Sequence, residues 1–572
     1  MYINILNLFV FYFLIFTAIL GYGFLFIRLS GIEFSKINIG FIGLYGIFFL
    51  ILYSYLSNIF LPHTHTHNLI TLIIGIGLFL YFFYKSFLKI NSKEVVVTIL
   101  ALFLFFIALL IYKNHDDFPY YHFPYTYYLT QYSLNIGMGI FGHGFRTPSS
   151  IFYLNSLFYL PVIKYYSFNF GQIFILLFAN LILLGNIFDY KFKLFVNSKK
   201  KFDPTFFLSL FSFIFINIFF YRISEHGTDR SAQILIFLLV IELTKLYVFK
   251  FNYNKHNILN LVILLTLIIS LKSFYILYSV LFLPLFIYIK NFSKSYFSSI
   301  KNLFFNFFTI SSFVLILLVF LTFFFNTGCF IYPLDFTCFD QFSWSIPKNN
   351  VKAMNDWYEL WSKAGATPTL RVSDPDIYIS SFNWVTGWID RYFFNKVSDF
   401  LLGLLFLTTV ILFLFNKNIK LSNLKKINKF NIFTFIIIFF LVVEWFFNHP
   451  ALRYGGYAII ALIFFIPLSY LISYRGMSFS EINKKIIALI MITIFVFLSR
   501  NIHRINKEVN QYNYQPVLYT FYKLDDSHFR IDKKMKEIIN YNIECSKQNE
   551  NCKENKQKMY KKFNINIFIK NK

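Results

Sequence analysis

Residues 95–128 read VVVTILALFLFFIALLIYKNHDDFPYYHFPYTYY, and this stretch decides the fold class. Its first part, 95–112, carries no charge and is long enough for a helix to cross about 30 Å of hydrocarbon. Two adjacent carboxylates, Asp116 and Asp117, follow where such a helix reaches the membrane–water boundary. Prolines and aromatic residues come next, which is typical of a helix lying on a bilayer. The stretch therefore predicts a membrane-spanning helix that ends in an acidic, aromatic segment.

The same apolar character extends over the whole 572-residue chain. Hydrophobic residues make up 57% and charged residues only 14%, whereas soluble proteins carry about 25% charged residues. A set of water-soluble domains is thereby excluded. The net charge of +26 fits cytoplasmic loops that collect lysine better than nucleic-acid binding, because no basic stripe with interleaved aromatics lies outside the apolar runs. We expect a lipid bilayer and no nucleic acid as partner.

Apolar runs close to the length of a membrane-spanning helix recur along residues 1–500, and residues 501–572 form a polar, lysine-rich tail. The predicted fold is all-α and integral to the membrane, with one polytopic domain and a tail outside the cytoplasm. We count fourteen spans, at about 4–27, 39–61, 69–88, 95–112, 169–190, 205–221, 231–250, 257–271, 274–290, 303–325, 398–415, 431–448, 455–474 and 485–500.

The loops between these runs fall into two alternating sets. One set is short and lysine-rich, which places it in the cytoplasm. An even number of spans then puts both termini outside a plasma (inner) membrane, with the active face periplasmic or extracellular. The outer set comprises 113–168, 221–230, 326–397 and 448–456.

The two large outer loops are expected to contain interfacial helices. Within the second, 348–363 predicts an amphipathic helix on the membrane surface. The four cysteines form two close pairs, Cys329/Cys338 and Cys545/Cys552, without histidines at zinc spacing. From the sequence, two small disulfide loops and four free thiols remain equally open.

Two outer segments supply candidate acids. Adjacent carboxylates at a helix end point in different directions, so we expect one of Asp116 and Asp117 to act as a base while the other caps or orients. The alternative is that both only cap the helix end next to solvent. The short connector 221–230 adds Glu225, His226 and Asp229. A metal bridging Asp229 to the first segment is one interpretation, although the spacing is not diagnostic. A solvated loop of internally paired charges is the alternative.

Candidate cations lie at the same predicted face. Of eleven arginines, only Arg28 and Arg475 fall on the cytoplasmic side, and guanidinium suits a bidentate bond to phosphate. Arg453 precedes a glycine pair that lets an anionic head group approach closely. Arg146 follows a Gly-rich stretch. Lys272 separates two apolar runs, where it either needs an anionic partner or extends from a tight outer turn.

A multi-span chain whose first large outer loop begins with an acidic pair directly after a helix, and continues as interfacial helices, resembles the GT-C superfamily of polytopic membrane glycosyltransferases. The motifs HDDFPYYHFP, GHGFRTPSS, HGTDR, SLKS and HPALRYG are similar to those of a related bacterial family of multi-pass membrane proteins. The resemblance covers roughly residues 95–475 and implies a GT-C-like bundle. It also implies that Asp117 or Asp116 is the base and that Asp229 holds a metal, Mg²⁺ or Mn²⁺, or orients the acceptor. Arg453, with Lys272 or Arg146, would bind the donor phosphate. Further expected substrate-binding residues are His143, His122, Glu225, His226 and Tyr121.

This resemblance implies transfer of a sugar from a polyprenyl-phosphate-linked donor to an envelope glycan, lipid or protein acceptor on the non-cytoplasmic face. Polysaccharide polymerases and ligases are the nearest alternative, but they place Arg and His in a large late outer loop, and here that loop has Arg371 and Arg391 without His. A lipid or polysaccharide transporter is the second alternative. Transporters tend to carry internal repeats and ionisable groups in mid-membrane, and neither is evident in this sequence.

Overall fold

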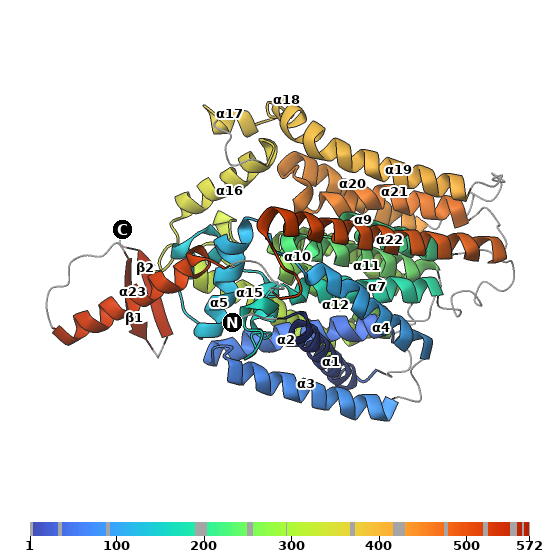
Figure 1. Ribbon diagram of the computed structural model, residues 1–572. Coiled ribbons are helices and arrows are strands. Elements are labelled where there is room, and N and C mark those ends of the chain that lie inside the picture. Colours follow the sequence, from blue (N-terminus) through green and yellow to red (C-terminus); the bar gives the residue numbers. More distant parts are fainter. Residues whose placement is uncertain are drawn as a thin grey trace.

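The computed structural model assigns nearly all ordered elements to helices (Figure 1). It describes residues 4–32, 37–86, 92–188, 203–248, 255–292, 295–366, 372–415, 429–473, 479–518, 524–548, 557–562 and 565–570. The chain is therefore an all-α membrane protein apart from one terminal β-hairpin, as the composition predicts.

Helical segments occupy every predicted apolar run. They are α1 (Ile5–Leu29), α2 (Ile39–Phe60), α3 (His65–Ser86), α4 (Ser92–Phe106) with the 3₁₀ turn η3 (Ile107–Leu109), α7 (Phe170–Phe188), α9 (Pro204–Phe219), α11 (Thr228–Val248), α12 (Lys255–Leu271), η8 (Ser273–Phe282) with α13 (Leu283–Phe292), α15 (Phe307–Thr327), α19 (Ser398–Leu414), α20 (Lys429–Asn448), α21 (Gly456–Ser473) and α22 (Phe479–Tyr512). Within the described ranges, ten helices are long and apolar enough to cross a membrane, and α9, α12 and α20 are shorter apolar helices. A multi-pass membrane protein follows, whereas the count of fourteen spans stays a prediction.

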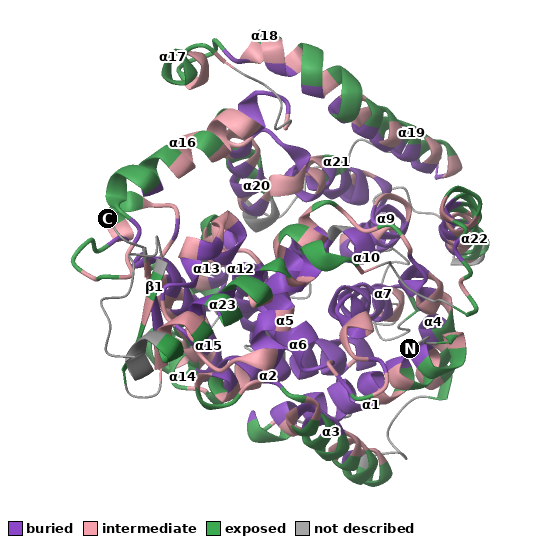
Figure 2. Cartoon of the chain, turned by 60° about the vertical axis from the view of Figure 1, so that its left-hand side comes forward, coloured by how far each residue is buried: buried purple, intermediate pink, exposed green. Residues whose placement is uncertain are grey.

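The bundle has a buried centre and an apolar rim. Figure 2 shows α7 and α12 almost entirely buried, while α3, α19 and α22 lie at the edge with exposed sides. The exposed side chains of α19 include Leu402, Phe406 and Phe413. Apolar side chains at such a rim match a hydrocarbon environment rather than water.

Short elements gather at one end of the bundle, on the left in Figure 1. They are η4 (Phe118–His122), α5 (Phe123–Gln131), η5 (Met138–Phe141), η6 (His143–Phe145), α6 (Ser150–Ser156), η7 (Tyr165–Ser167), α10 (Ile223–His226), η9 (Asp335–Thr337), α16 (Lys348–Lys363), α17 (Pro375–Ile379), α18 (Val385–Trp388), η10 (Ile389–Val397), η12 (Leu452–Tyr454), α23 (Asp526–Gln548) and the antiparallel hairpin of β1 (Gln557–Lys562) and β2 (Ile565–Lys570). A short helix, α14 (Tyr296–Phe304), precedes α15. Helix α16 covers the residues for which an amphipathic helix is predicted, and its place on a membrane surface stays a prediction.

Contacts between distant segments define this end of the bundle. The Asn326 side chain donates to the Phe145 carbonyl at 3.1 Å, and the Ser343 and Tyr560 hydroxyls are 2.8 Å apart. The Ile5 amide donates to the Val517 carbonyl at 3.2 Å. The first and last large loops, the start of α1 and the tail therefore lie together, and we call this the site end. Its exposure to the periplasm or exterior stays a prediction.

Cys329 and Cys338 form a disulfide at the site end. The sequence left a disulfide and two free thiols equally open for this pair, and the structure has the disulfide. Disulfides persist in oxidising compartments, which is consistent with a site end outside the cytoplasm. The Cys545 side chain and Cys552 lie outside the described residues.

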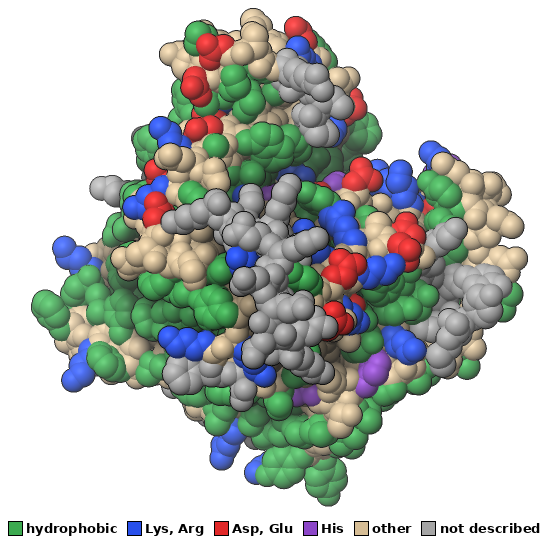
Figure 3. Space-filling view, turned by 90° about the vertical axis from the view of Figure 1, so that its left-hand side faces the viewer, with side chains coloured by type: hydrophobic (Ala, Val, Ile, Leu, Met, Phe, Trp, Pro, Cys, Tyr) green, Lys and Arg blue, Asp and Glu red, His purple; other side chains and the backbone are tan. Residues whose placement is uncertain are grey.

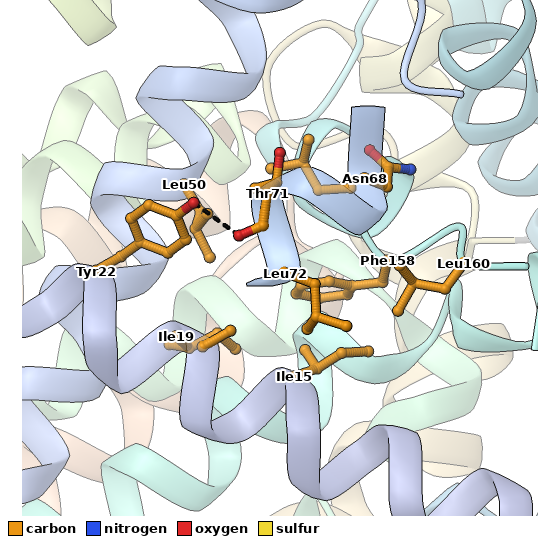
Figure 4. Close-up of a pocket in the computed structure, with 11 residues that line it drawn as sticks. Ile15, Ile19, Tyr22, Leu50, Asn68, Thr71, Leu72, Phe158 and Leu160 are labelled. Atoms are coloured by element: carbon orange, nitrogen blue, oxygen red, sulfur yellow. Dashed lines mark hydrogen bonds between the residues drawn. The ribbon is translucent and has the colours of Figure 1, made fainter. Parts of the chain in front are cut away.

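An apolar cavity of about 20 Å³ lies among α1, α2 and α3 (Figure 4). Its lining includes Ile15, Ile19 and Phe158, and the Tyr22 hydroxyl donates to the Thr71 carbonyl at 2.8 Å beside it. The volume is about that of one water molecule, and no charged side chain lines it. The cavity is a packing defect, and the chemistry lies elsewhere.

Close packing of α1 on α2 requires glycine, which generates a prediction. A Cβ at Gly46 would lie 1.9 Å from the Ile19 carbonyl oxygen, whereas a Cβ at Gly77 would meet nothing within 4 Å. Gly46→Ala should therefore lower the free energy of unfolding by about 1–3 kcal/mol because the two backbones must separate. Thermal unfolding in nanodiscs measures this change. Gly77→Ala is the matched control, and an equal loss in both variants would contradict the proposed packing.

Candidate functional site

Four charged side chains from four distant segments meet at the site end. Arg453 donates from Nε to Asp229 Oδ2 at 3.0 Å and from Nη2 to Asp117 Oδ2 at 3.1 Å. The Lys272 ammonium lies 2.7 Å from Asp229 Oδ1. We call these four residues the charge quartet. Figure 3 looks onto this end of the molecule, where acidic and basic side chains lie interspersed.

Each member of the quartet lies at or beside a helix end. Asp117 immediately precedes η4, and Asp229 lies in the first turn of α11. Lys272 separates α12 from η8 with extended backbone angles, φ −152° and ψ 111°. Arg453 belongs to the short turn η12 between α20 and α21. Lys272 therefore lies between two helical segments and has the anionic partner that a lysine between two apolar runs requires.

Gly455 has a conformational role in the turn after Arg453. Its φ of +106° favours glycine, and a Cβ there would lie 2.5 Å from the Tyr278 hydroxyl. The glycine therefore allows the turn after Arg453 and the approach of Tyr278.

The quartet is electrically neutral, with two carboxylates and two cations. Burial acts to raise the pKa of Asp117, but Arg453, with His122 and His115, outweighs it and holds that pKa below its ordinary value. Asp117 is therefore ionised at neutral pH. Its Oδ1, the Arg453 Nη1 group and two of the three Lys272 protons have no hydrogen-bond partner among the described residues. These atoms remain able to contact a ligand.

Aromatic rings surround the two cations. The Arg453 guanidinium lies 5.5 Å from the Trp361 ring centre and 5.8 Å from that of Tyr454. The Lys272 ammonium lies 5.4 Å from the Tyr454 ring centre. Burial, and then the charge of Asp117, raise the pKa of the Tyr121 hydroxyl well above its ordinary value. The quartet thus lies in an aromatic setting that strengthens its electrostatic interactions.

His122 is a buried neutral imidazole beside the quartet. Its side chain is 7% exposed, and its Nε2 has no hydrogen-bond partner among the described atoms. Burial lowers its pKa to about 4, against the opposing effects of Asp117 and Asp229. The ring packs against Gly227, where a Cβ would lie 2.8 Å from the His122 Cε1 atom. An unpaired buried nitrogen this close to two carboxylates is suited to a polar ligand atom.

His143 and Arg146 lie at the edge of this site and have no hydrogen bond to the quartet among the described residues. The Tyr120 hydroxyl and His143 Nδ1 are 3.2 Å apart, and the His143 ring lies 6.2 Å from Trp357 of α16. Arg146 donates to the Gly139 carbonyl at 3.0 Å and to the Tyr332 hydroxyl at 3.2 Å. In the part that the structure describes, Arg146 has no ion-pair partner, so its charge is not neutralised.

Asp116 and Glu225, which were also expected at the site, lie apart from the quartet. Asp116 is exposed and forms no ion pair within the described ranges, so Asp117 alone of the acidic pair faces the cluster. Glu225 is buried and pairs with Arg222 through both oxygens, and it lies 3.9 Å from Arg504 of α22. The side chain of His226 falls outside the described residues.

The quartet does not fit a bridging metal. Arg453 occupies the position between the Asp117 and Asp229 carboxylates. Among the described residues, no group of three or more His, Cys, Asp or Glu side chains is arranged to hold an ion. Mg²⁺ and Mn²⁺ therefore have no evident ligand set in this arrangement.

Sequence reasoning missed two contributors to the site. Trp361 is not among the site residues expected from the sequence, but its ring centre lies 5.5 Å from the Arg453 guanidinium. Arg504 comes from the last long helix and donates to the Leu110 carbonyl at 2.9 Å, just before the acidic pair. Arg504 lies in the polar stretch that follows the last apolar run, and nothing in that stretch singled it out.

The family model described as "Domain of unknown function (DUF8201)" matches residues 5–460. The matched span includes all four residues of the quartet and ends before α22. Neither the curated proteins nor the solved structures give a match.

The buried imidazole of His122 predicts a pH-dependent stability. With a folded pKa of about 4 against 6.5 in the unfolded chain, the unfolded state takes up the proton first as the pH falls. The contribution of His122 is complete above pH 6.5 and declines by about 3 kcal/mol between pH 6.5 and pH 4. Thermal unfolding in nanodiscs at pH 7.5, 6, 5 and 4 should show a shallower decline in His122→Gln than in the wild type.

The exposed His503→Gln provides the control for loss of an imidazole. Equal pH dependence in His122→Gln and the wild type would contradict the buried neutral state of His122.

Proposed function

This chain belongs to the family described as a domain of unknown function (DUF8201), and from that premise we propose that it is a membrane glycosyltransferase of the GT-C type. It moves a sugar from a polyprenyl-phosphate-linked donor to an envelope glycan, lipid or protein acceptor. The active face is the non-cytoplasmic side of the inner (plasma) membrane, with both termini outside. The quartet of Asp117, Asp229, Lys272 and Arg453 is the observation that carries this proposal.

The leaving group of this reaction requires cations at the outer leaflet. When the anomeric carbon–oxygen bond breaks, the electron pair stays on the lipid phosphate, whose charge then increases. Arg453 and Lys272 are held at one place by Asp229, at 3.0 Å and 2.7 Å. Their unused donors are available to the phosphate oxygens. Arg146 supplies a further unneutralised charge at the edge of the site.

The acceptor requires a base. Its hydroxyl oxygen forms the new bond to the anomeric carbon, and its proton must pass to a nearby group. Asp117 is ionised and presents Oδ1 to a ligand, so it receives this proton. In the absence of a donor, Arg453 bonds to Asp117 and weakens it as a base. A donor phosphate that takes over Arg453 Nη2 makes Asp117 more basic when the substrate is present.

The acidic partner Asp229 acts as an organiser. It accepts hydrogen bonds from both Lys272 and Arg453 and therefore orients the cations without a metal.

A polymerase or ligase remains the closest alternative. Arg391 of its expected late loop is exposed, and Arg371 lies outside the described residues. For a transporter, the supporting feature would be ionisable groups in mid-membrane, whereas the quartet lies at helix ends.

Donor turnover tests the proposal. Protein in nanodiscs is incubated with a panel of radiolabelled polyprenyl-phosphate sugars and a membrane extract as acceptor source, and released polyprenyl phosphate is measured. Asp117→Asn should lower the rate by about 10²–10⁴-fold because the proton acceptor is lost. Arg453→Lys should lower the rate by about 10²–10³-fold, because an ammonium cannot replace the bidentate hydrogen bonds that a guanidinium donates.

Asp116→Asn is the matched control, since Asp116 is the exposed neighbour, and it should turn over close to the wild-type rate. Equal turnover by Asp117→Asn and the wild type would overturn the assigned base. No turnover of any donor by the wild type would count against the transferase itself.

A further inference from the structure

The chain beyond residue 500 contacts the segment that carries Asp117 at three places. The first lies just before the acidic pair. The Arg504 guanidinium donates to the Leu110 carbonyl at 2.9 Å, and the Tyr112 amide donates to Glu508 Oε2 at 2.9 Å. The Tyr112 ring also stacks on Tyr512 with centres 4.9 Å apart. The outer part of α22 thereby fixes the backbone at the end of the span before Asp117.

The second contact lies just after the acidic pair. Arg530 of α23 donates to the Tyr120 carbonyl at 2.6 Å, and its guanidinium lies 4.6 Å from the Tyr120 ring centre. The Tyr120 hydroxyl in turn contacts His143. Neighbouring Phe529 packs edge-on against Phe123. One side chain, Tyr120, therefore connects the tail to the edge of the site.

The third contact uses the backbone of β2. The Ile136 amide donates to the Asn566 carbonyl at 3.0 Å, and the Phe568 amide donates to the Ile136 carbonyl at 2.9 Å. Gly137 has a φ of +82°, and a Cβ there would lie 2.0 Å from the Phe568 carbonyl oxygen. Only glycine permits this approach. Phe568 is fully buried and packs on Phe141.

The segment needs external support because its own structure is short. Between α4 and α7 it consists of brief 3₁₀, π and α turns, which close few hydrogen bonds of their own and open easily. The tail contacts it on both sides of Asp117 and again before His143. Contacts of this kind restrict backbone motion at the places where quartet geometry is set.

We propose that the end of α22 from Arg504 onward, α23 and β2 together form a clamp that positions the segment 110–146, with Arg530 as a positioning residue for Tyr120 and His143. The clamp lies outside the quartet and contributes no reacting group. It acts through the backbone on either side of Asp117. This role holds for any chemistry at the site, so it does not depend on the proposed glycosyl transfer.

Hydrogen–deuterium exchange of the full-length protein in nanodiscs tests the clamp without an activity assay. Arg530→Ala should accelerate exchange at least several-fold in peptides from 110–146 and leave peptides of α12 and α15 unchanged. Gly137→Ala changes the other side of the contact, because its new Cβ would displace β2 from the segment. It should accelerate exchange in the same peptides. Arg530→Lys retains a donor and a cation over the Tyr120 ring, and it should restore most of the protection.

Lys533→Ala is the matched control on the same helix, since among the described residues the ion-pair partner of Lys533 is the exposed Asp526. Unchanged exchange of 110–146 in both Arg530→Ala and Gly137→Ala would overturn the clamp. A uniform increase over the whole chain would also overturn it, because the contacts would then serve global folding. Acceleration confined to 110–146 supports it whatever the outcome of the donor assay.

Discussion

Pairing of charge away from bulk water is the constraint on which this end of the molecule depends. Two carboxylates and two cations form three ion pairs at the end of an apolar bundle, with nitrogen–oxygen distances of 2.7–3.1 Å. Removing one partner of such a cluster leaves an uncompensated charge, at a cost of a few kcal/mol even with partial exposure to solvent. The helix ends that carry these groups must therefore arrive in register. This requirement couples α11, α12, the turn η12 and the segment after α4.

Arg453 is the centre of this coupling because it is the residue that contacts both acids. Guanidinium suits that position, since its planar donors reach two carboxylates in different directions and keep others in reserve. Under the proposed function, the same arrangement would link binding to reactivity, because a donor phosphate would compete with Asp117 for the guanidinium.

The sequence predicted the helical character well because a membrane-spanning helix needs an unbroken apolar run, which is a local property. It also identified all four residues of the quartet, since charged residues at the ends of apolar runs stand out. It did not separate Asp116 from Asp117, because the direction of adjacent side chains depends on the turn that follows. Glu225 was assigned to the site, but it pairs with Arg222 and approaches Arg504 of α22, and sequence spacing carries no record of the contact with α22.

The tail shows a second limit of sequence reasoning. Its hairpin reaches the site segment through the backbone amides of Ile136 and Phe568, and backbone pairing leaves no signature in residue type. Arg530 contacts the carbonyl and the ring of Tyr120. In the sequence, nothing distinguishes this arginine from the many other basic residues of the tail. Polar composition alone therefore indicated a tail, whereas its docking depends on the shape of the partner surface.

A double-mutant cycle between Asp117 and Arg453 tests the convergence of distant charges most directly. Unfolding free energies in nanodiscs are compared for the wild type, Asp117→Asn, Arg453→Gln and the double variant. The structure predicts a coupling on the order of 1 kcal/mol, because both side chains are partly exposed and form one ion pair. The same cycle with Asp116 should give a coupling near zero. Zero coupling for Asp117 would mean that the two groups do not meet, and it would contradict the account.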